Sequence, residues 1–157
     1  MPKHEEMRSL PYSAKQMFDL VAEIEKYPDF LPWCKRAEIL SREGKRVVAD
    51  LVIGYKIFQE KFTSEVVLNR PHSIIVHYRS GPLSHLSNSW EFKSLGQKKC
   101  ELSFQLDFDF HSTFLRTTMN LFFEKALSKM VACFEVRAKE LYGDTCEDTQ
   151  RLIHKSK

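Results

Sequence analysis

The chain has 157 residues and carries 24 basic and 21 acidic side chains, which gives a formal net charge of +3. This length is sufficient for one domain with a substantial core and too short for a second full domain. Charged residues make up 29% and hydrophobic residues 43% of the composition, which is ordinary for a globular protein and argues against general disorder. The mild positive charge includes no long basic block, so it gives no indication of DNA binding.

The two ends of the chain differ in character. Residues 1–10 are charged and lack the apolar stretch of a signal peptide, and no apolar run approaches the roughly 18 to 20 residues of a membrane span. We therefore expect a cytoplasmic protein whose contact with membranes is at most peripheral. Gly143 marks a helix stop, and residues 144–157 after it are polar. We expect residues 1–143 to form one domain and residues 144–157 a flexible tail.

Near the start, Ser13 is suited to cap a helix whose apolar face comprises Met17, Phe18, Leu20, Val21 and Ile24. Pro28 is expected to break this helix. Residues 27–33 then combine two prolines with four large apolar side chains. This segment is too short to form a core of its own, so it must pack over another part of the fold.

From Lys35 onward the hydrophobic period changes to two, which predicts strands at about 35–43, 46–55, 57–68, 73–80, 86–95 and 98–110. The short connections contain Gly, Pro and Asn and favour antiparallel hairpins. In the last strand, large apolar side chains alternate with polar ones, so one face is apolar and the other polar: Leu102, Phe104, Leu106, Phe108, Phe110. The sheet is therefore expected to be covered on one side only.

A long helix should supply that cover. Ser112 or Thr113 can cap a helix that runs to about Leu141, and its apolar residues recur at helical spacing: Leu115, Met119, Phe122, Phe123, Ala126, Leu127, Met130, Phe134, Ala138. About thirty residues would span roughly 45 Å at 1.5 Å per residue, and only a wide curved sheet could use that length. The order of strand, helix, six strands and long helix predicts an α+β fold, in which a seven-stranded antiparallel sheet wraps around the C-terminal helix.

Catalytic and metal-binding motifs are missing from the sequence. The six histidines show no metal-ligand spacing, and no nucleophile motif such as GxSxG is present. The four cysteines are widely spaced and predict reduced thiols. His77 and His111 are the histidines of most interest, but His77 belongs to the outer face of its strand, as do Asp107 and Asp109 by alternation. No inward carboxylate or imidazole is evident, so we predict a protein with no enzymatic activity, no catalytic residue, no metal and no required cofactor.

Four segments carry a family resemblance: YPDFLPWC at 27–34, EKFTS at 60–64, GPLSHLSNSWEF at 81–92 and MVACFEVRAKELYG at 130–143. Together they resemble the coenzyme Q-binding START-like proteins, a family that includes the bacterial RatA-type proteins and belongs to the polyketide cyclase (SRPBCC) superfamily. The resemblance covers about residues 3–143 and implies a helix-grip START-like fold. One departure is Leu83, which follows Gly81 and Pro82 where the family more usually has Phe.

The resemblance implies a function as well. It indicates a carrier or chaperone for ubiquinone, or for a late prenylquinone intermediate, that supports respiration or quinone synthesis without chemical turnover. The alternative is a RatA-type toxin that binds the ribosome and blocks the association of its subunits. Either role fits a bacterial-type cytoplasmic chain without a targeting peptide, at most peripheral at the inner membrane. Arg116, Lys125 and Lys129 could contact lipid headgroups or ribosomal RNA phosphates, although cations on a helix usually form only a solvated face.

A bound prenylquinone requires a long apolar tunnel with a few polar groups at the head. The residues predicted to line it are Tyr55, Phe62, Tyr78, Leu86, Trp90, Phe104, Leu106, Phe108, Met119, Phe122, Phe123, Ala126 and Met130. For each of them a plain core position is at least as good an explanation, because the same large side chains could fill the space. A second group could form a lid over the mouth, dip into a membrane surface, or merely seal the sheet edge: Tyr27, Phe30, Leu31, Trp33.

Overall fold

The computed structural model describes residues 3–55 and 58–143; within these ranges it leaves out the side chains of Tyr55, Phe58, Asn120, Leu121 and Phe123. The expected tail at 144–157 lies outside the described residues and stays a prediction. The elements in chain order are β1 (Lys3–Leu10), α1 (Ala14–Ala22), the 3-10 helix η1 (Ile24–Asp29), β2 (Cys34–Glu43), β3 (Arg46–Tyr55), β4 (Phe58–Asn69), β5 (Ser73–Ser80), β6 (Leu83–Gly96), β7 (Lys99–Phe110) and α2 (Thr113–Tyr142).

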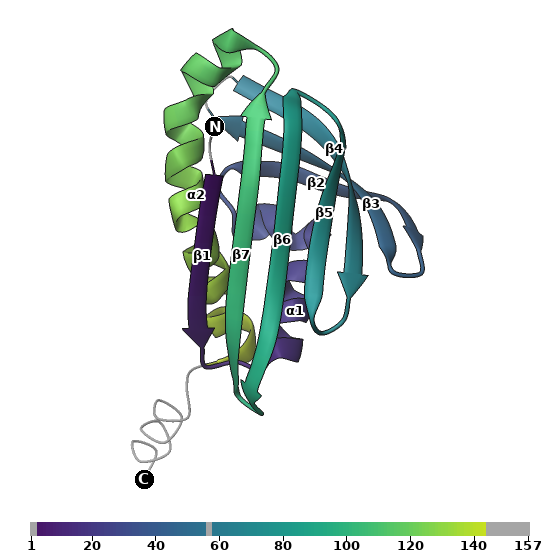
Figure 1. The fold of residues 1–157 in the computed structure, drawn as a ribbon, viewed down its shortest axis with the longest axis vertical. Coiled ribbons are helices and arrows are strands. Elements are labelled where there is room, and N and C mark those ends of the chain that lie inside the picture. Colours follow the sequence, from purple (N-terminus) through teal and green to yellow (C-terminus); the bar gives the residue numbers. More distant parts are fainter. Residues whose placement is uncertain (1–2, 56–57, 144–157) are drawn as a thin grey trace.

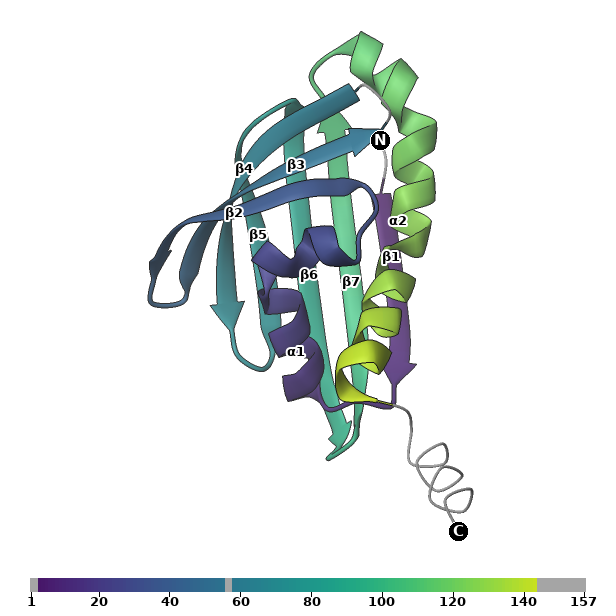
Figure 2. The ribbon, with the colours of Figure 1, turned by 180° about the vertical axis from the view of Figure 1, so that it is seen from behind.

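The strands form one antiparallel sheet in the order β1-β7-β6-β5-β4-β3-β2 (Figure 1). Each strand from β2 to β7 pairs with its neighbours in the chain, and β1 closes the far edge beside β7. Seen from behind, α1, η1 and α2 all lie on one face of this curved sheet (Figure 2). The predicted α+β helix-grip fold with seven antiparallel strands is confirmed.

Helix α1 begins where the sequence predicts. The Ser13 hydroxyl accepts a hydrogen bond from the Gln16 backbone N–H, and the Gln16 side chain accepts one from the Ser13 N–H, which is a complete capping box. The expected break at Pro28 is wrong in position. The α-helix already ends at Ala22, and Pro28 lies inside the separate helix η1.

Helix α2 grips the open side of the sheet. Ser112 caps it by accepting hydrogen bonds from the backbone of Phe114 and Leu115, and it ends before Gly143, which has a φ of 84°. Its inner stripe is buried: Met119, Ala126, Leu127, Val131, Phe134, Ala138. The helix thus presents one apolar side to the concave face of the sheet, as its spacing predicts.

The hairpin between β5 and β6 depends on a close backbone approach. Gly81 has a φ of +143°, and a Cβ atom at this position would lie 2.6 Å from the Cβ of Phe62. Next to it, the backbone N–H of Leu83 donates a hydrogen bond of 3.0 Å to the Tyr78 hydroxyl. Only glycine lets this turn press against β4, and so Gly81 helps to fix one wall of the interior.

Candidate functional site

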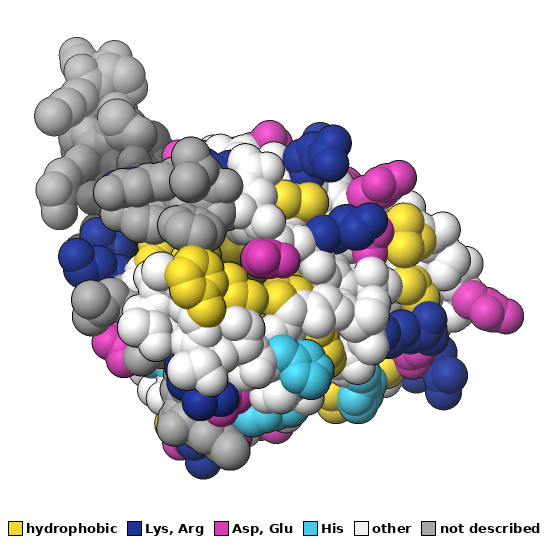
Figure 3. All heavy atoms as spheres, turned by 90° about the horizontal axis from the view of Figure 1, so that it is seen from above, with side chains coloured by type: hydrophobic (Ala, Val, Ile, Leu, Met, Phe, Trp, Pro, Cys, Tyr) yellow, Lys and Arg dark blue, Asp and Glu magenta, His cyan; other side chains and the backbone are white. Residues whose placement is uncertain are grey.

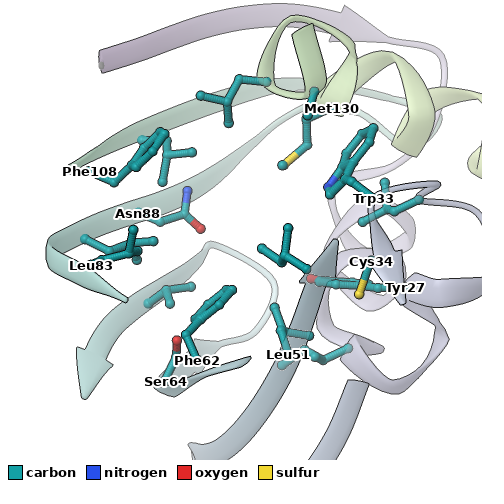
Figure 4. A pocket seen from close by; sticks show the side chains of 18 of the residues that line it. Tyr27, Trp33, Cys34, Leu51, Phe62, Ser64, Leu83, Asn88, Phe108 and Met130 are labelled. Carbon is teal, nitrogen blue, oxygen red and sulfur yellow. The ribbon is translucent and has the colours of Figure 1, made fainter. Parts of the chain in front are cut away.

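An apolar cavity of about 150 Å³ lies between the concave face of the sheet, helix α2 and the η1 segment (Figure 4). A cavity of this size lined by Leu, Ile and Phe holds one benzene-sized ring. The walls come from strands β3 to β7 on one side, and from α2, η1, the segment after η1 and Cys34 at the start of β2 on the other. The described part of the chain therefore contains a preformed interior site for an apolar group.

Most of the predicted tunnel residues line this cavity: Phe62, Leu86, Trp90, Phe104, Leu106, Phe108, Met119, Ala126, Met130. Tyr78 and Phe122 do not line it. Tyr78 holds the β5–β6 turn through its hydroxyl, and Phe122 is half-buried against the core. The side chains of Tyr55 and Phe123 lie outside the described ones. Contact between these residues and a ligand remains a prediction.

The predicted lid residues are packed inward. Tyr27 and Phe30 meet Phe134 of α2 edge-on, with ring centroids 5.4 and 5.1 Å apart. Leu31 and Trp33 are 3% and 7% exposed and line the cavity together with Tyr27. In this structure the segment thus closes one side of the cavity, and its apolar side chains face inward.

The cavity is also lined by three polar side chains that the sequence did not lead us to expect there. They are Glu60 and Ser64 of β4 and Asn88 of β6. The expectation of no inward carboxylate is therefore wrong for Glu60. Strand alternation could have found all three, because Glu60 and Ser64 share the face of Phe62, and Asn88 follows Leu86 by two residues.

Among the described residues, Ser64 is the buried polar side chain that lacks a hydrogen-bond partner. It is 3% exposed, and its Oγ atom makes no hydrogen bond among the described residues. A buried hydroxyl without a partner costs about 1–3 kcal/mol. Opposite Ser64 in the β3–β4 pair is Ala49, also buried, so two small side chains face each other where neighbouring positions carry large ones.

The other polar groups differ in how they are held. The Asn88 amide nitrogen donates a hydrogen bond of 2.8 Å to the Gln105 carbonyl oxygen. Figure 4 shows the Asn88 amide and the Trp33 indole nitrogen turned toward the cavity. Glu60 is half-buried and makes no ion pair with any described residue. The cavity is thus an apolar site with a small number of polar positions.

The cavity wall also contains a protected thiol. Burial raises the pKa of the Cys34 thiol to about 11, and burial likewise raises the pKa of the neighbouring Tyr27 hydroxyl. The Tyr27 hydroxyl donates a hydrogen bond to the Val21 carbonyl. Both groups stay neutral near pH 7, which keeps the cavity wall free of their charges.

We expect Cys34 to react more than tenfold more slowly with iodoacetamide in the folded protein than in the urea-unfolded chain, near pH 8.5, the usual pKa of a free thiol. The reason is that a raised pKa leaves little thiolate. By the same linkage, the stability contributed by the neutral thiol is fully present below the unfolded pKa and is lost as the pH rises toward about 11. Peptide mass spectrometry would measure the rate, and equal rates in both states would contradict the burial of Cys34.

Among the described residues, no group of three or more His, Cys, Asp or Glu side chains is placed to hold a metal ion. His77 is exposed on the outer face of β5, as predicted. The Nε2 atom of His85 lies 3.2 Å from the Oδ1 atom of Asp107. No described helix is long and apolar enough to cross a membrane. Basic and acidic side chains are interspersed on the end of the molecule seen in Figure 3.

The three cations predicted to meet phosphates differ in availability. Arg116 forms an ion pair with Asp109, with a nitrogen to oxygen distance of 3.0 Å, and it also donates a hydrogen bond to the Phe110 carbonyl. Lys125 and Lys129 lie one turn apart on the exposed side of α2 and make no ion pair within the described ranges. These two lysines, unlike Arg116, are free to contact a partner.

Comparison with known proteins identifies the family. The family model described as "Polyketide cyclase / dehydrase and lipid transport" matches residues 10–135. The chain belongs to this polyketide cyclase family. The apolar cavity is consistent with the lipid transport named in the description of this family. As the sequence predicts, the described cysteines Cys34, Cys100 and Cys133 are free thiols.

Similar proteins are named for ribosome association, for persistence and stress resistance, or for coenzyme Q binding. The ribosome association toxin RatA of Pseudomonas aeruginosa is 37% identical over 85% of this chain and 93% of its own length, and that of Escherichia coli is 33% identical over 91% and 90%. The mitochondrial coenzyme Q-binding protein COQ10 homolog B of Xenopus laevis is 31% identical over 90% of this chain and 59% of its own length. This member of the polyketide cyclase family thus resembles proteins named for association with ribosomes and for quinone binding.

Solved structures support the fold. The 18 kDa protein CC1736 of Caulobacter crescentus is 32% identical, with a TM-score of 0.72 over 92% of this chain and all of that one. The Zhui aromatase/cyclase from a Streptomyces species has a TM-score of 0.76 over 88% of this chain and 93% of that one. At 17% identity, the second likeness extends to the fold alone. The fold therefore also occurs in cyclases.

Proposed function

We propose that this polyketide cyclase family member is a non-catalytic binding protein of the RatA type that associates with the ribosome. The observation that carries the proposal is the similarity to proteins named RatA, which extends over at least 90% of the length of the Pseudomonas and Escherichia relatives. From the amino-acid sequence alone, quinone carriage is the first expectation. The relatives favour the ribosome, because several of them are named RatA and the quinone-binding relative matches over 59% of its length.

The exposed side of α2 is the part of the described surface that we expect to contact ribosomal RNA. Lys125 and Lys129 are exposed there and form no ion pair with another described residue, whereas Arg116 is paired with Asp109. Contacts between such cations and phosphates weaken with salt, since binding releases counterions. Binding should accordingly decrease between low and high ionic strength.

Exchange of these lysines tests the proposal. We expect the double variant Lys125→Glu and Lys129→Glu to lower affinity for purified ribosomal subunits more than tenfold, because two attractive charges become repulsive. The measurement is co-sedimentation with separated large and small subunits. The matched control is Lys15→Glu with Lys99→Glu, two exposed lysines on other elements, which should bind as the wild type does. Equal binding by all three proteins would remove the α2 surface from the proposal.

Prenylquinone carriage is the second candidate, and the cavity favours it. The walls are almost entirely apolar, and a quinone ring is close to the size that about 150 Å³ accommodates. The name of the Xenopus relative supports the same ligand class. Both candidates are compatible, since one uses the interior and the other the outer surface.

Filling the cavity tests the second candidate. Met130 is half-buried and reaches into the cavity in Figure 4. We expect Met130→Trp to abolish co-purification of lipid while the protein stays folded, because the larger side chain occupies the ligand's space. The readout is mass spectrometry of an organic extract from protein purified without detergent out of ubiquinone-making cells. The control is Val136→Trp on the exposed side of α2, which should retain the lipid. A folded wild-type protein that yields no quinone would contradict this candidate.

A further inference from the structure

We infer that the cavity holds its ligand by a hydrogen bond to the Ser64 hydroxyl, with an oxygen-bearing head at the closed end and an apolar chain directed to the mouth. The ligand class is a neutral amphipathic molecule with a carbonyl or hydroxyl oxygen. The inference deepens the second candidate function and rests on the cavity being a ligand site.

Burial shows which end of the cavity is closed. Along the inner face of β4, Ser64 is 3% exposed and Phe62 8%, whereas Glu60 is only half-buried. Strand β3 repeats the gradient, since Ala49 is 2% exposed and Ile53, the partner of Glu60, is half-buried. Ser64 thus lies at the closed end, and Glu60 marks the side toward the mouth.

The chemistry at Ser64 indicates what the closed end takes. The hydroxyl lines the cavity and has no partner among the described residues. If the cavity bound only hydrocarbon, an apolar side chain at position 64 would make the protein more stable, because a buried hydroxyl without a partner is destabilising. Since a hydroxyl both donates and accepts, a ligand carbonyl or hydroxyl oxygen would complete its hydrogen bonding.

Space and charge agree with this orientation. Ser64 faces Ala49 across the strand pair, so the two small side chains leave room beside the hydroxyl. The cavity volume of about 150 Å³ accommodates one ring, and a longer chain must therefore extend toward the mouth. The Glu60 carboxylate on that side disfavours an anionic head at the mouth.

Substitution of Ser64 tests the inference with three probes that share a ten-carbon chain. The probes are a decyl-substituted dimethoxy-methyl-benzoquinone, 1-decanol and decylbenzene, which has no oxygen. Equilibrium dialysis would measure their affinities for the full-length wild type, Ser64→Ala, and the control Ser87→Ala on the exposed outer face of β6. We expect Ser64→Ala to lose about threefold to tenfold in affinity for the tighter oxygenated probe, the loss of one neutral hydrogen bond, and to bind decylbenzene unchanged. Whichever oxygenated probe binds more tightly shows whether the head group of the ligand is a quinone or an alcohol.

The outcomes distinguish a failure of the Ser64 inference from a failure of the second candidate function, ligand binding in the cavity. If the wild type binds no probe, the cavity is not a ligand site and both fail. If the wild type binds the probes and Ser64→Ala binds them equally well, or loses all three equally, the inference alone is overturned. The thermal midpoint of Ser64→Ala should equal or exceed that of the wild type. A lower midpoint with unchanged probe preference would assign the hydroxyl to the fold and overturn the inference.

Discussion

Phe134→Ala is expected to lower the free energy of unfolding by about 3–5 kcal/mol, the range for deletion of a fully buried aromatic side chain. Phe134 is 1% exposed, and its ring packs against those of Tyr27, Phe30 and Trp90, at centroid distances of 5.4, 5.1 and 4.9 Å. It therefore joins α2, the η1 segment and the sheet at one point. Urea unfolding followed by circular dichroism would measure the effect.

The matched control for Phe134 lies on the same helix. Val136 is 59% exposed, so Val136→Ala should change stability by no more than about 0.5 kcal/mol. A loss of less than about 1 kcal/mol in Phe134→Ala would show that the helix and the η1 segment are not held together through this ring.

Gly81→Ala is expected to cost about 2–5 kcal/mol, because two effects add. A non-glycine residue at a φ of +143° has a strained backbone, which costs about 1–3 kcal/mol. In addition, the new Cβ atom would lie 2.6 Å from the Cβ atom of Phe62, and this overpacking costs a similar amount. Thermal and urea unfolding would measure the loss. We also expect weaker ligand binding, since Phe62 lines the cavity.

Gly96 offers a close control for Gly81. Its φ of +150° is nearly the same, but a Cβ there would meet nothing within 4 Å. Gly96→Ala should therefore show only the backbone strain, and the difference between the two variants isolates the contact with Phe62. Equal losses in both would contradict the close approach of the β5–β6 turn to β4.

Much of the fold could be predicted because its signals are local. Alternation of apolar and polar residues in 102–110 fixed the buried face of β7, and the cap at Ser112 fixed the start of α2. The early end of α1 could not be predicted in the same way. Pro28 predicts a later break, yet the α-helix ends at Ala22 and the proline lies inside η1.

The cavity was less predictable than the fold. Apolar spacing marks residues such as Trp90 and Phe104 as inward, but it does not distinguish a filled core from a wall around a space, because that difference depends on how the sheet curves over α2. The polar positions Glu60, Ser64 and Asn88 were within reach of the same alternation rule. Their polar side chains are not expected in an apolar interior, so hydrophobicity alone does not mark them as lining residues.

Sedimentation of ribosomes in a sucrose gradient tests the central proposal most directly. Purified full-length protein would be added to separated large and small subunits under conditions that allow them to join, and the gradient fractions would be probed for the protein. The proposal predicts that the protein migrates with one subunit and that less of the joined ribosome forms. If the protein stays at the top of the gradient and the subunits join as they do without it, the ribosome is not its partner, and quinone carriage becomes the better proposal.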